Sequence, residues 1–316
     1  MTLPEIYGHE DVWARLNALL AADRLPHALL FLGAPGIGKS LVAQRLAARL
    51  ACTDAAPPCG ACAGCRQLLA GSHPDVLAIS APERGRRETR KKEIGIEQAR
   101  ALKRFVQLQA VSAARKIAIV DDADRLSIAA QNALLKTLEE PPGHAAIVLI
   151  TATPGALLPT VRSRCQRIAF RPLSDDDVVA ALTTAAGVSP DEARQLASDS
   201  RGSPGQALEW RALWEDADRA ELLARLAALQ DGRYASILAM SKGLGRTEPE
   251  TAARLEGLLA VCHAEAADAA ARDDAAGLAR AVRRADSVSE ALSTLRRRNP
   301  NRPLLTEALA LRLART

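Results

Sequence analysis

The chain has 316 residues, of which 48% are hydrophobic but only 3% aromatic, and its formal net charge is +5. This length is enough for two or three domains with their own cores, and a composition rich in alanine and leucine favours helices. The mildly basic balance is compatible with nucleic-acid contact without establishing it. No apolar run approaches the length of a membrane span and no secretory leader pattern begins the sequence, so we expect a cytoplasmic protein without membrane contact.

The first half of the sequence alternates predicted helices with buried strands. Apolar residues at helical spacing predict a helix within 5–22, and the apolar run "HALLFLG" that follows predicts a strand. Further strands are predicted at 75–80, in "RKIAIVDDAD" and in "AAIVLITAT", with helices in "LVAQRLAARLAC", "GIEQARALKRFVQLQA" and "SIAAQNALLKTLEEPP". Pro141 and Pro142 end the last of these helices. Such alternation predicts an α/β domain, at 1–171, with a parallel sheet covered on both faces.

From about residue 172 onward the sequence predicts helices only. Ser174 and Ser189 precede two short amphipathic stretches and are typical N-cap residues, and Pro190 suits a first helical turn. We therefore expect a small helical domain at 172–209. The remainder, 210–316, contains several amphipathic helical patterns and predicts a second, all-helical domain.

The stretch "GAPGIGKS" fits the phosphate-binding pattern G-x-x-x-x-G-K-[ST] through Gly33, Gly36, Gly38, Lys39 and Ser40. In this pattern backbone N–H groups surround phosphate oxygens, the lysine reaches the β- and γ-phosphates, and the hydroxyl binds Mg²⁺. A glycine-rich turn that binds nothing is the alternative, and the preceding strand and following helix argue against it. Asp121 ends a later strand, where an acid would orient the Mg²⁺ shell, and Asp122 follows where a motor ATPase usually has glutamate.

Four of the six cysteines lie within residues 52–65, in the pattern C-x6-C-x2-C-x2-C formed by Cys52, Cys59, Cys62 and Cys65. Four thiolates at this spacing can surround one Zn²⁺ tetrahedrally, whereas free or buried thiols are the plainer alternative. No histidine or general base lies inside the cluster, so the sequence predicts a structural zinc module. Cys262 is interpreted as an ordinary buried helix residue.

The P-loop, the four cysteines, "NALLKTLEEPP" and "SRC" at 163–165 together resemble a bacterial clamp loader, the AAA+ complex that opens the sliding clamp for the replicative polymerase. The resemblance covers nearly the whole chain and implies an AAA+ domain, a helical lid and an all-α collar that mediates oligomerisation. It also implies that Arg164 is an arginine finger that reaches the ATP of a neighbouring subunit. Thr151 aligns best with the family's polar sensor, with Thr153 as a weaker candidate, and the stretch from Tyr7 to Glu10 aligns with the adenine contact.

Within this family the chain resembles the non-motor subunit more than the motor. The motor has Asp-Glu in its second acidic motif and a lid arginine in a pattern like G-S-x-R-D-A-L, whereas this chain has "GSPGQAL" at 202–208, with Gly205 at the arginine position. The stretch "GSHPDVL" at 71–77 is also similar to the non-motor subunit. The resemblance then implies a stator in a hetero-pentameric ring with motor subunits and a delta subunit, acting on the sliding clamp and primer–template DNA during DNA replication.

Such a stator belongs to a DNA-directed DNA polymerase holoenzyme but has little or no ATPase and no polymerase activity of its own. Because the P-loop is intact, ATP or ADP with Mg²⁺ remains a possible ligand. The alternatives are the ATP-hydrolysing motor of the same loader and, less well matched, a small-molecule kinase. The basic stretch from Arg86 to Lys92 could contact DNA, although charge runs of this kind are usually only solvated.

Overall fold

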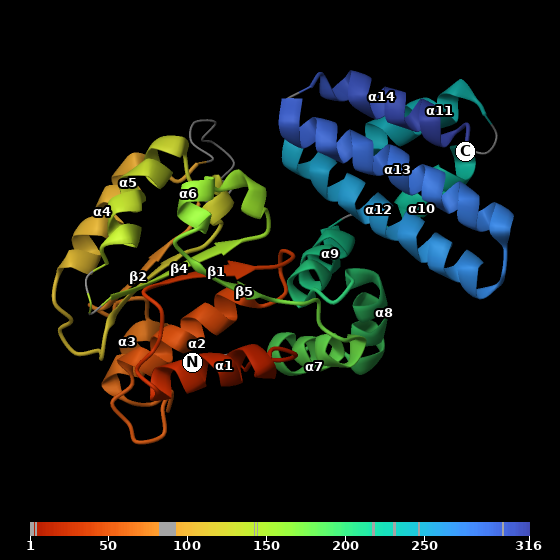
Figure 1. The fold of residues 1–316 in the computed structure, drawn as a ribbon. Coiled ribbons are helices and arrows are strands. Elements are labelled where there is room, and N and C mark those ends of the chain that lie inside the picture. Colours follow the sequence, from red (N-terminus) through yellow and green to blue (C-terminus); the bar gives the residue numbers. More distant parts are fainter. Residues whose placement is uncertain are drawn as a thin grey trace. The chain divides into compact units, whose positions relative to one another are not determined.

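The computed structural model describes residues 3, 5–81, 93–141, 143, 145–216, 219–229, 232–245, 247–298 and 300–316. The chain forms two compact units, one made of residues 1–197 with 201–205 and the other of 198–200 with 206–316 (Figure 1). Most of the predicted lid therefore belongs to the first unit, and the boundaries predicted at 171 and 209 stay predictions. The basic stretch from Arg86 to Lys92 lies outside the described residues.

A five-stranded parallel sheet forms the centre of the first unit, in the order β2-β3-β4-β1-β5. Strands β3 and β4 are buried along their whole length, which explains why they are apolar without alternation. The carboxyl ends of β1 and β4 lie side by side, with Leu32 paired to Thr151. The strands span Ala28–Leu32 (β1), Val76–Ile79 (β2), Lys116–Val120 (β3), Ala145–Thr151 (β4) and Gln166–Ala169 (β5). The parallel sheet predicted from the sequence is confirmed.

Helices cover both faces of this sheet, with α4 and α5 on one side and α1 and α2 on the other (Figure 1). Leu102 of α4 and Leu134 of α5 pack in one core with Leu30, Ala118 and Ile147 of the strands. The helices of this part span Glu10–Ala21 (α1), Lys39–Ala51 (α2), Ala63–Leu69 (α3), Ile96–Gln107 (α4), Ile128–Glu139 (α5), Pro159–Arg162 (α6), Asp175–Ala186 (α7) and Pro190–Ser200 (α8). Two short 3-10 turns, η1 (Ala123–Arg125) and η2 (Pro154–Ala156), follow β3 and β4.

The predicted caps of α7 and α8 are confirmed. The Ser174 hydroxyl accepts a hydrogen bond from the backbone N–H of Asp177, and the Ser189 hydroxyl accepts one from Glu192. Each cap satisfies an N–H group that has no partner within its helix. Helix α5 ends at Glu139, just before Pro141, as the sequence predicts.

The second unit consists of helices throughout its described residues. They span Pro204–Asp216 (α9, which begins in the first unit), Arg219–Ala228 (α10), Tyr234–Gly243 (α11), Glu248–Ala271 (α12), Ala275–Arg298 (α13) and Arg302–Leu313 (α14). Asn301 caps α14 and Pro303 lies in its first turn, while Cys262 is fully buried on α12 as predicted. Among the described residues, no helix is both long and apolar enough to cross a bilayer.

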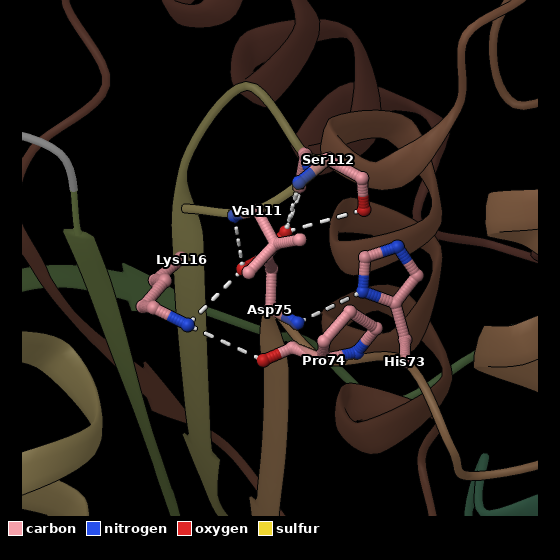
Figure 2. A network of polar contacts seen from close by, with 7 residues as sticks. His73, Pro74, Asp75, Val111, Ser112 and Lys116 are labelled. Carbon is pink, nitrogen blue, oxygen red and sulfur yellow. Dashed lines mark hydrogen bonds and ion pairs between the residues drawn. The ribbon is translucent and has the colours of Figure 1, made fainter. Parts of the chain in front are cut away.

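A buried carboxylate fixes the amino-terminal edge of the sheet (Figure 2). Asp75, fully buried, accepts hydrogen bonds from the backbone N–H groups of Val111, Ser112 and Ala113 at 2.7–2.9 Å. It also lies 3.1 Å from the Nζ of Lys116, which is itself 3% exposed. The loop between α4 and β3 is thereby attached to the residue that precedes β2.

These contacts lower the pKa of Asp75 and favour its ionised form. Burial alone would raise its pKa, but the three N–H donors and the Lys116 ammonium outweigh burial and hold the pKa well below its usual range. The adjacent His73 accepts the N–H of Asp75 at its Nδ1, while its buried Nε2 has no hydrogen-bond partner among the described residues.

Candidate nucleotide, arginine and metal sites

The predicted phosphate loop joins β1 to α2 in a conformation suited to cradle an anion. Gly36 and Gly38 have φ values of 71° and 97°, which glycine adopts without strain, and α2 begins at Lys39. Backbone N–H groups at the start of a helix are natural anion donors. The strand–loop–helix context that the motif requires is therefore present, and Ser40 follows Lys39 in the first turn of α2.

Lys39 is held inside this loop. The residue is only 6% exposed, and its Nζ donates hydrogen bonds to the carbonyls of Gly33 at 2.9 Å and Ala34 at 2.5 Å. Burial lowers the pKa of Lys39, while the charges of the nearby aspartates 121, 124 and 122 oppose that shift. An incoming phosphate would have to replace these carbonyl partners.

Residues 203 and 205, within the predicted lid, form hydrogen bonds with the same loop. The backbone N–H of Gly205 donates to the carbonyl of Gly36 at 2.9 Å, and the hydroxyl of Ser203 donates to the carbonyl of Pro35 at 2.9 Å. A Cβ atom at position 205 would lie 2.7 Å from the Cα of Gly36, closer than real side chains approach. Position 205 therefore lacks the arginine that the resemblance assigns to the motor's lid, and it also lacks room for any side chain in this arrangement.

The acidic residues follow the carboxyl end of β3, which pairs with β4 on one side and β2 on the other. Asp121 directly follows β3, and Asp122 has a left-handed backbone with φ of 52°. Burial, followed by the charges of Asp121 and Asp124, raises the pKa of Asp122, although Arg125 lies 3.7 Å from its carboxylate. Asp121 thus lies at the carboxyl edge of the sheet, the edge from which the phosphate loop also leaves β1, and its role as a Mg²⁺ ligand stays a prediction.

The predicted sensor Thr151 ends β4 and is 1% exposed. Its hydroxyl donates to a carboxylate oxygen of Asp124 at 2.7 Å and accepts the N–H of Thr153 at 2.9 Å. The sequence analysis did not single out Asp124, because an acid in a polar turn is too common to be a signal. The threonine is oriented by that acid, and its sensor role stays a prediction.

The predicted adenine stretch, Tyr7 to Glu10, contributes one buried side chain to the loop. The Nε2 of His9 donates to the carbonyl of Ile37 at 2.6 Å, and its ring meets Phe170 edge-on with centroids 4.9 Å apart. His9 therefore joins the phosphate loop to Phe170, just after β5, a contact that the sequence analysis did not identify.

Arg164 follows α6, away from the chain's own phosphate loop in sequence, and has two partners on the first unit. Its Nη2 lies 2.5 Å from the Oε1 of Glu139, and its Nη1 donates to the carbonyl of Thr160 at 2.8 Å. The side chain remains 32% exposed, so part of it is accessible to solvent despite these two contacts. The adjacent Cys165 is buried, which raises the pKa of its thiol to about 11.

The four clustered cysteines converge on one point, since their sulfur atoms all lie within 4.8 Å of one another. The Sγ of Cys52 lies 3.5 Å from that of Cys59 and 3.8 Å from that of Cys62. A tetrahedron of thiolates around zinc, with Zn–S bonds of about 2.3 Å, has sulfur–sulfur edges of about 3.8 Å. The donor set and its spacing therefore fit a Zn²⁺ ion, which these four residues would hold.

Backbone N–H groups form hydrogen bonds with the cysteine sulfur atoms, an arrangement that favours thiolates. N–H groups of Cys59, Cys62 and Cys65 donate to the sulfur of the preceding cysteine at 3.3–3.4 Å. The N–H of Cys65 is the main cause that lowers the pKa of Cys62 to about 6, whereas burial raises that of Cys65 to about 12. Gly64 is required between them, because a Cβ there would lie 2.2 Å from the carbonyl of Ala51.

Comparisons with known proteins agree with this arrangement. Residues 8–174 match the family described as DNA polymerase III, delta subunit. A DNA polymerase III subunit delta′ from Pseudomonas aeruginosa is 39% identical over 209 residues, which are 64% of this chain and 60% of that protein. The subunit of the same name from Escherichia coli is 37% identical over 196 residues, or 61% and 57% of the two chains.

Proteins described as tau and gamma-related subunits are also similar to the chain. A DNA polymerase III subunit tau from Bacillus subtilis is 34% identical over 177 residues, which are 55% of this chain but 30% of that one. A solved structure described as a DNA polymerase III gamma-subunit-related protein from Thermotoga maritima has a TM-score of 0.43 at 18% identity, over 95% of this chain and 99% of that one. The matched segment covers 60% or less of the curated relatives' own length. Because the family match spans more than half of the sequence, the clamp-loader resemblance is confirmed, and the chain belongs to the DNA polymerase III delta-subunit family.

Proposed function

We propose that the chain is the delta-prime, non-motor subunit of the DNA polymerase III clamp loader and helps to load the sliding clamp onto primed DNA during replication. The observation that carries the proposal is the direct backbone contact between Gly205 and the phosphate loop. A motor needs a lid cation at this position, according to the resemblance, and here the loop and the lid are too close for one.

The remaining chemistry also favours phosphate binding over hydrolysis. Lys39 would hold the phosphates, and Ser40 and Asp121 would hold Mg²⁺, which would neutralise phosphate charge. Hydrolysis further needs a carboxylate that orients the attacking water. Asp122 is one methylene shorter than glutamate, and a misplacement of about 1 Å can cost about a hundredfold in rate. Nucleotide in this chain would therefore act as a structural ligand.

Arg164 would act on a neighbouring subunit instead. A guanidinium placed at a subunit boundary can stabilise the charge that develops on a partner's γ-phosphate. Its side chain is accessible and lies on the AAA+ unit, which supports this role. The chain would thus raise the ATPase of one motor subunit without turning over ATP at its own site.

The second unit and the zinc module would have structural roles in the complex. The helices of the second unit would form a collar with those of the motor and delta subunits in a hetero-pentameric ring. The zinc module would stabilise a knob beside the AAA+ sheet. Contacts with the sliding clamp and primer–template DNA would be made through the complex, and we assign no polymerase activity to the chain itself.

A motor role is the second candidate, because the phosphate loop is intact and tau subunits are among the relatives. Steady-state ATPase assays separate the two. We expect negligible turnover by the purified chain with or without primed DNA and clamp. Turnover typical of a motor, abolished by Lys39→Ala, would establish the second candidate instead.

The arginine role is tested in a loader reconstituted with the motor and delta subunits of the same organism. Arg164→Ala should lower the DNA- and clamp-stimulated ATPase only in part, because one motor site of several faces this chain. Arg167→Ala, which removes an exposed arginine from β5, is the matched control and should leave the rate unchanged. An undiminished rate in a fully assembled Arg164→Ala loader would contradict the role.

A further inference from the structure

The contact between Glu139 and Arg164 joins the two sequence motifs "LEEPP" and "SRC". Glu139 is the last residue of α5, and its Oε1 lies 2.5 Å from Nη2 of Arg164. The Nη1 of the same guanidinium donates to the carbonyl of Thr160 on α6 at 2.8 Å. A carboxylate on α5 and a carbonyl on α6 thus each contact one terminal nitrogen of the same planar guanidinium.

Glu139 lies at the end of a helix that is packed into the core. The residue before it, Leu138, is 1% exposed and belongs to the core beneath the sheet, together with Leu134. The helix stops at Glu139, so the carboxylate projects from a fixed end and not from a mobile loop. An unrestrained arginine carries roughly 2 kcal/mol of side-chain conformational entropy, part of which would have to be lost each time it docked on a phosphate.

We propose that Glu139 is a positioning residue that fixes the orientation of the Arg164 guanidinium for a neighbouring subunit's phosphate. The proposal rests on the proposed function of Arg164. A guanidinium has five N–H donors in a rigid fork, so the two observed contacts leave donors for an anion. The pair is partly exposed, 47% on Glu139 and 32% on Arg164, so the carboxylate orients the fork without holding its charge tightly.

The proposal predicts a graded effect on the reconstituted loader. The rate to follow is the part of the ATPase that depends on Arg164, defined as the wild-type rate minus the Arg164→Ala rate. Glu139→Ala should reduce the kcat of that part by about fivefold, because a pre-oriented hydrogen bond of this kind contributes about 1 kcal/mol. The KM for ATP should change little, since the neighbour's own loop binds the nucleotide.

Two further variants separate orientation from charge. Glu139→Gln retains an oxygen that can accept the same hydrogen bond and should keep most of the rate. Glu140→Ala removes the adjacent exposed carboxylate at the end of α5 and should keep all of it. The double variant Glu139→Ala with Arg164→Ala should be no slower than Arg164→Ala alone, because the first residue acts only through the second.

Each outcome decides the matter. If Arg164→Ala itself leaves the rate unchanged, the finger and its positioning residue both fail. If Arg164→Ala lowers the rate but Glu139→Ala does not, the positioning role alone is wrong. If Glu139→Ala and Glu139→Gln both raise the rate, the carboxylate screens the arginine instead of orienting it, which also overturns the proposal.

Discussion

The variant Gly205→Arg tests whether one missing side chain accounts for the negligible ATPase that we propose for this chain. In the structure, a Cβ at 205 would lie 2.7 Å from the Cα of Gly36, whereas ordinary contacts begin at 3.4 Å. The two backbone segments would therefore have to separate by about 0.7 Å. The hydrogen bond from Gly205 N–H to the Gly36 carbonyl, now 2.9 Å, would lengthen to about 3.6 Å and be lost.

The free-energy cost of this separation can be estimated from the hydrogen bonds that would be lost together. The hydrogen bond from Ser203 to the Pro35 carbonyl joins the same two segments and would weaken with the first. Each such bond contributes about 1 kcal/mol net, so the lid segment should be released from the loop more readily by about 2 kcal/mol. Amide exchange in peptides covering 33–40 and 201–208 should accelerate by about thirtyfold, the factor that corresponds to about 2 kcal/mol.

The expected result is release of the lid without a gain of ATPase, because Asp122 still lacks the reach of glutamate. Hydrogen exchange and steady-state ATPase should be measured on the isolated chain and on the reconstituted loader. Gly155→Arg is the matched control, since a Cβ at this exposed glycine of η2 meets nothing within 4 Å. Gly205→Ala separates the effect of Cβ from that of charge and should accelerate exchange in the same peptides.

Two results would refute this reasoning. If Gly205→Arg turned over ATP at a rate that Lys39→Ala abolished, the missing cation alone would account for the negligible turnover proposed for the unmodified chain. If exchange in the phosphate loop were as slow in Gly205→Arg as in Gly155→Arg, the close approach of lid and loop would not exist in solution.

Three further predictions concern other sites. Metal analysis of the purified chain should give about one zinc per chain, and Cys62→Ser should lose it while α12–α14 keep their amide protection; a zinc-free protein with four titratable thiols would contradict the site. Asp75→Asn should destabilise the first unit by about 3 kcal/mol at pH 7, because Lys116 loses its buried partner. Since the folded pKa of Asp75 lies well below its unfolded value, that stabilisation is complete above about pH 4 and is lost progressively as the pH falls toward the folded pKa, so the melting temperatures should converge in strong acid. Lys39→Ala should leave the ATPase and clamp loading of the assembled loader near normal, whereas a collapse of both with assembly intact would show a working ATPase site.

Local sequence features were sufficient to predict most of the fold. The apolar runs that became β3 and β4 are buried along their length, and Ser174 and Ser189 cap the helices that follow them. These features depend on neighbours within a few residues, so spacing and cap chemistry are enough to identify them. The convergence of four cysteines is likewise contained within one short segment.

The long-range contacts of the site could not be predicted in the same way. Ser203 and Pro35 are 168 residues apart, and Glu139 and Arg164 are joined only because α5 and α6 lie near each other. Nothing near Asp75 in the sequence marks it as a fully buried acid, since its donors come from the loop after α4. Such pairs are decided by sheet order and helix packing, which a single sequence does not specify.

If the proposed function holds, the contacts of Lys39 indicate how a bound nucleotide would affect the stability of the first unit. Its ammonium now pairs with two carbonyls and has a pKa lowered by burial, so an anionic phosphate would be a stronger partner than either carbonyl. Binding would stabilise the conformation of the loop. Because Gly205 is hydrogen-bonded to Gly36 of that loop, binding would also stabilise the conformation of the predicted lid. A ligand that binds only the folded state stabilises it according to its concentration and affinity, without any turnover. Nucleotide should therefore raise the melting temperature of the first unit, and Lys39→Ala should remove that increase while Arg164 continues to serve the neighbouring subunit.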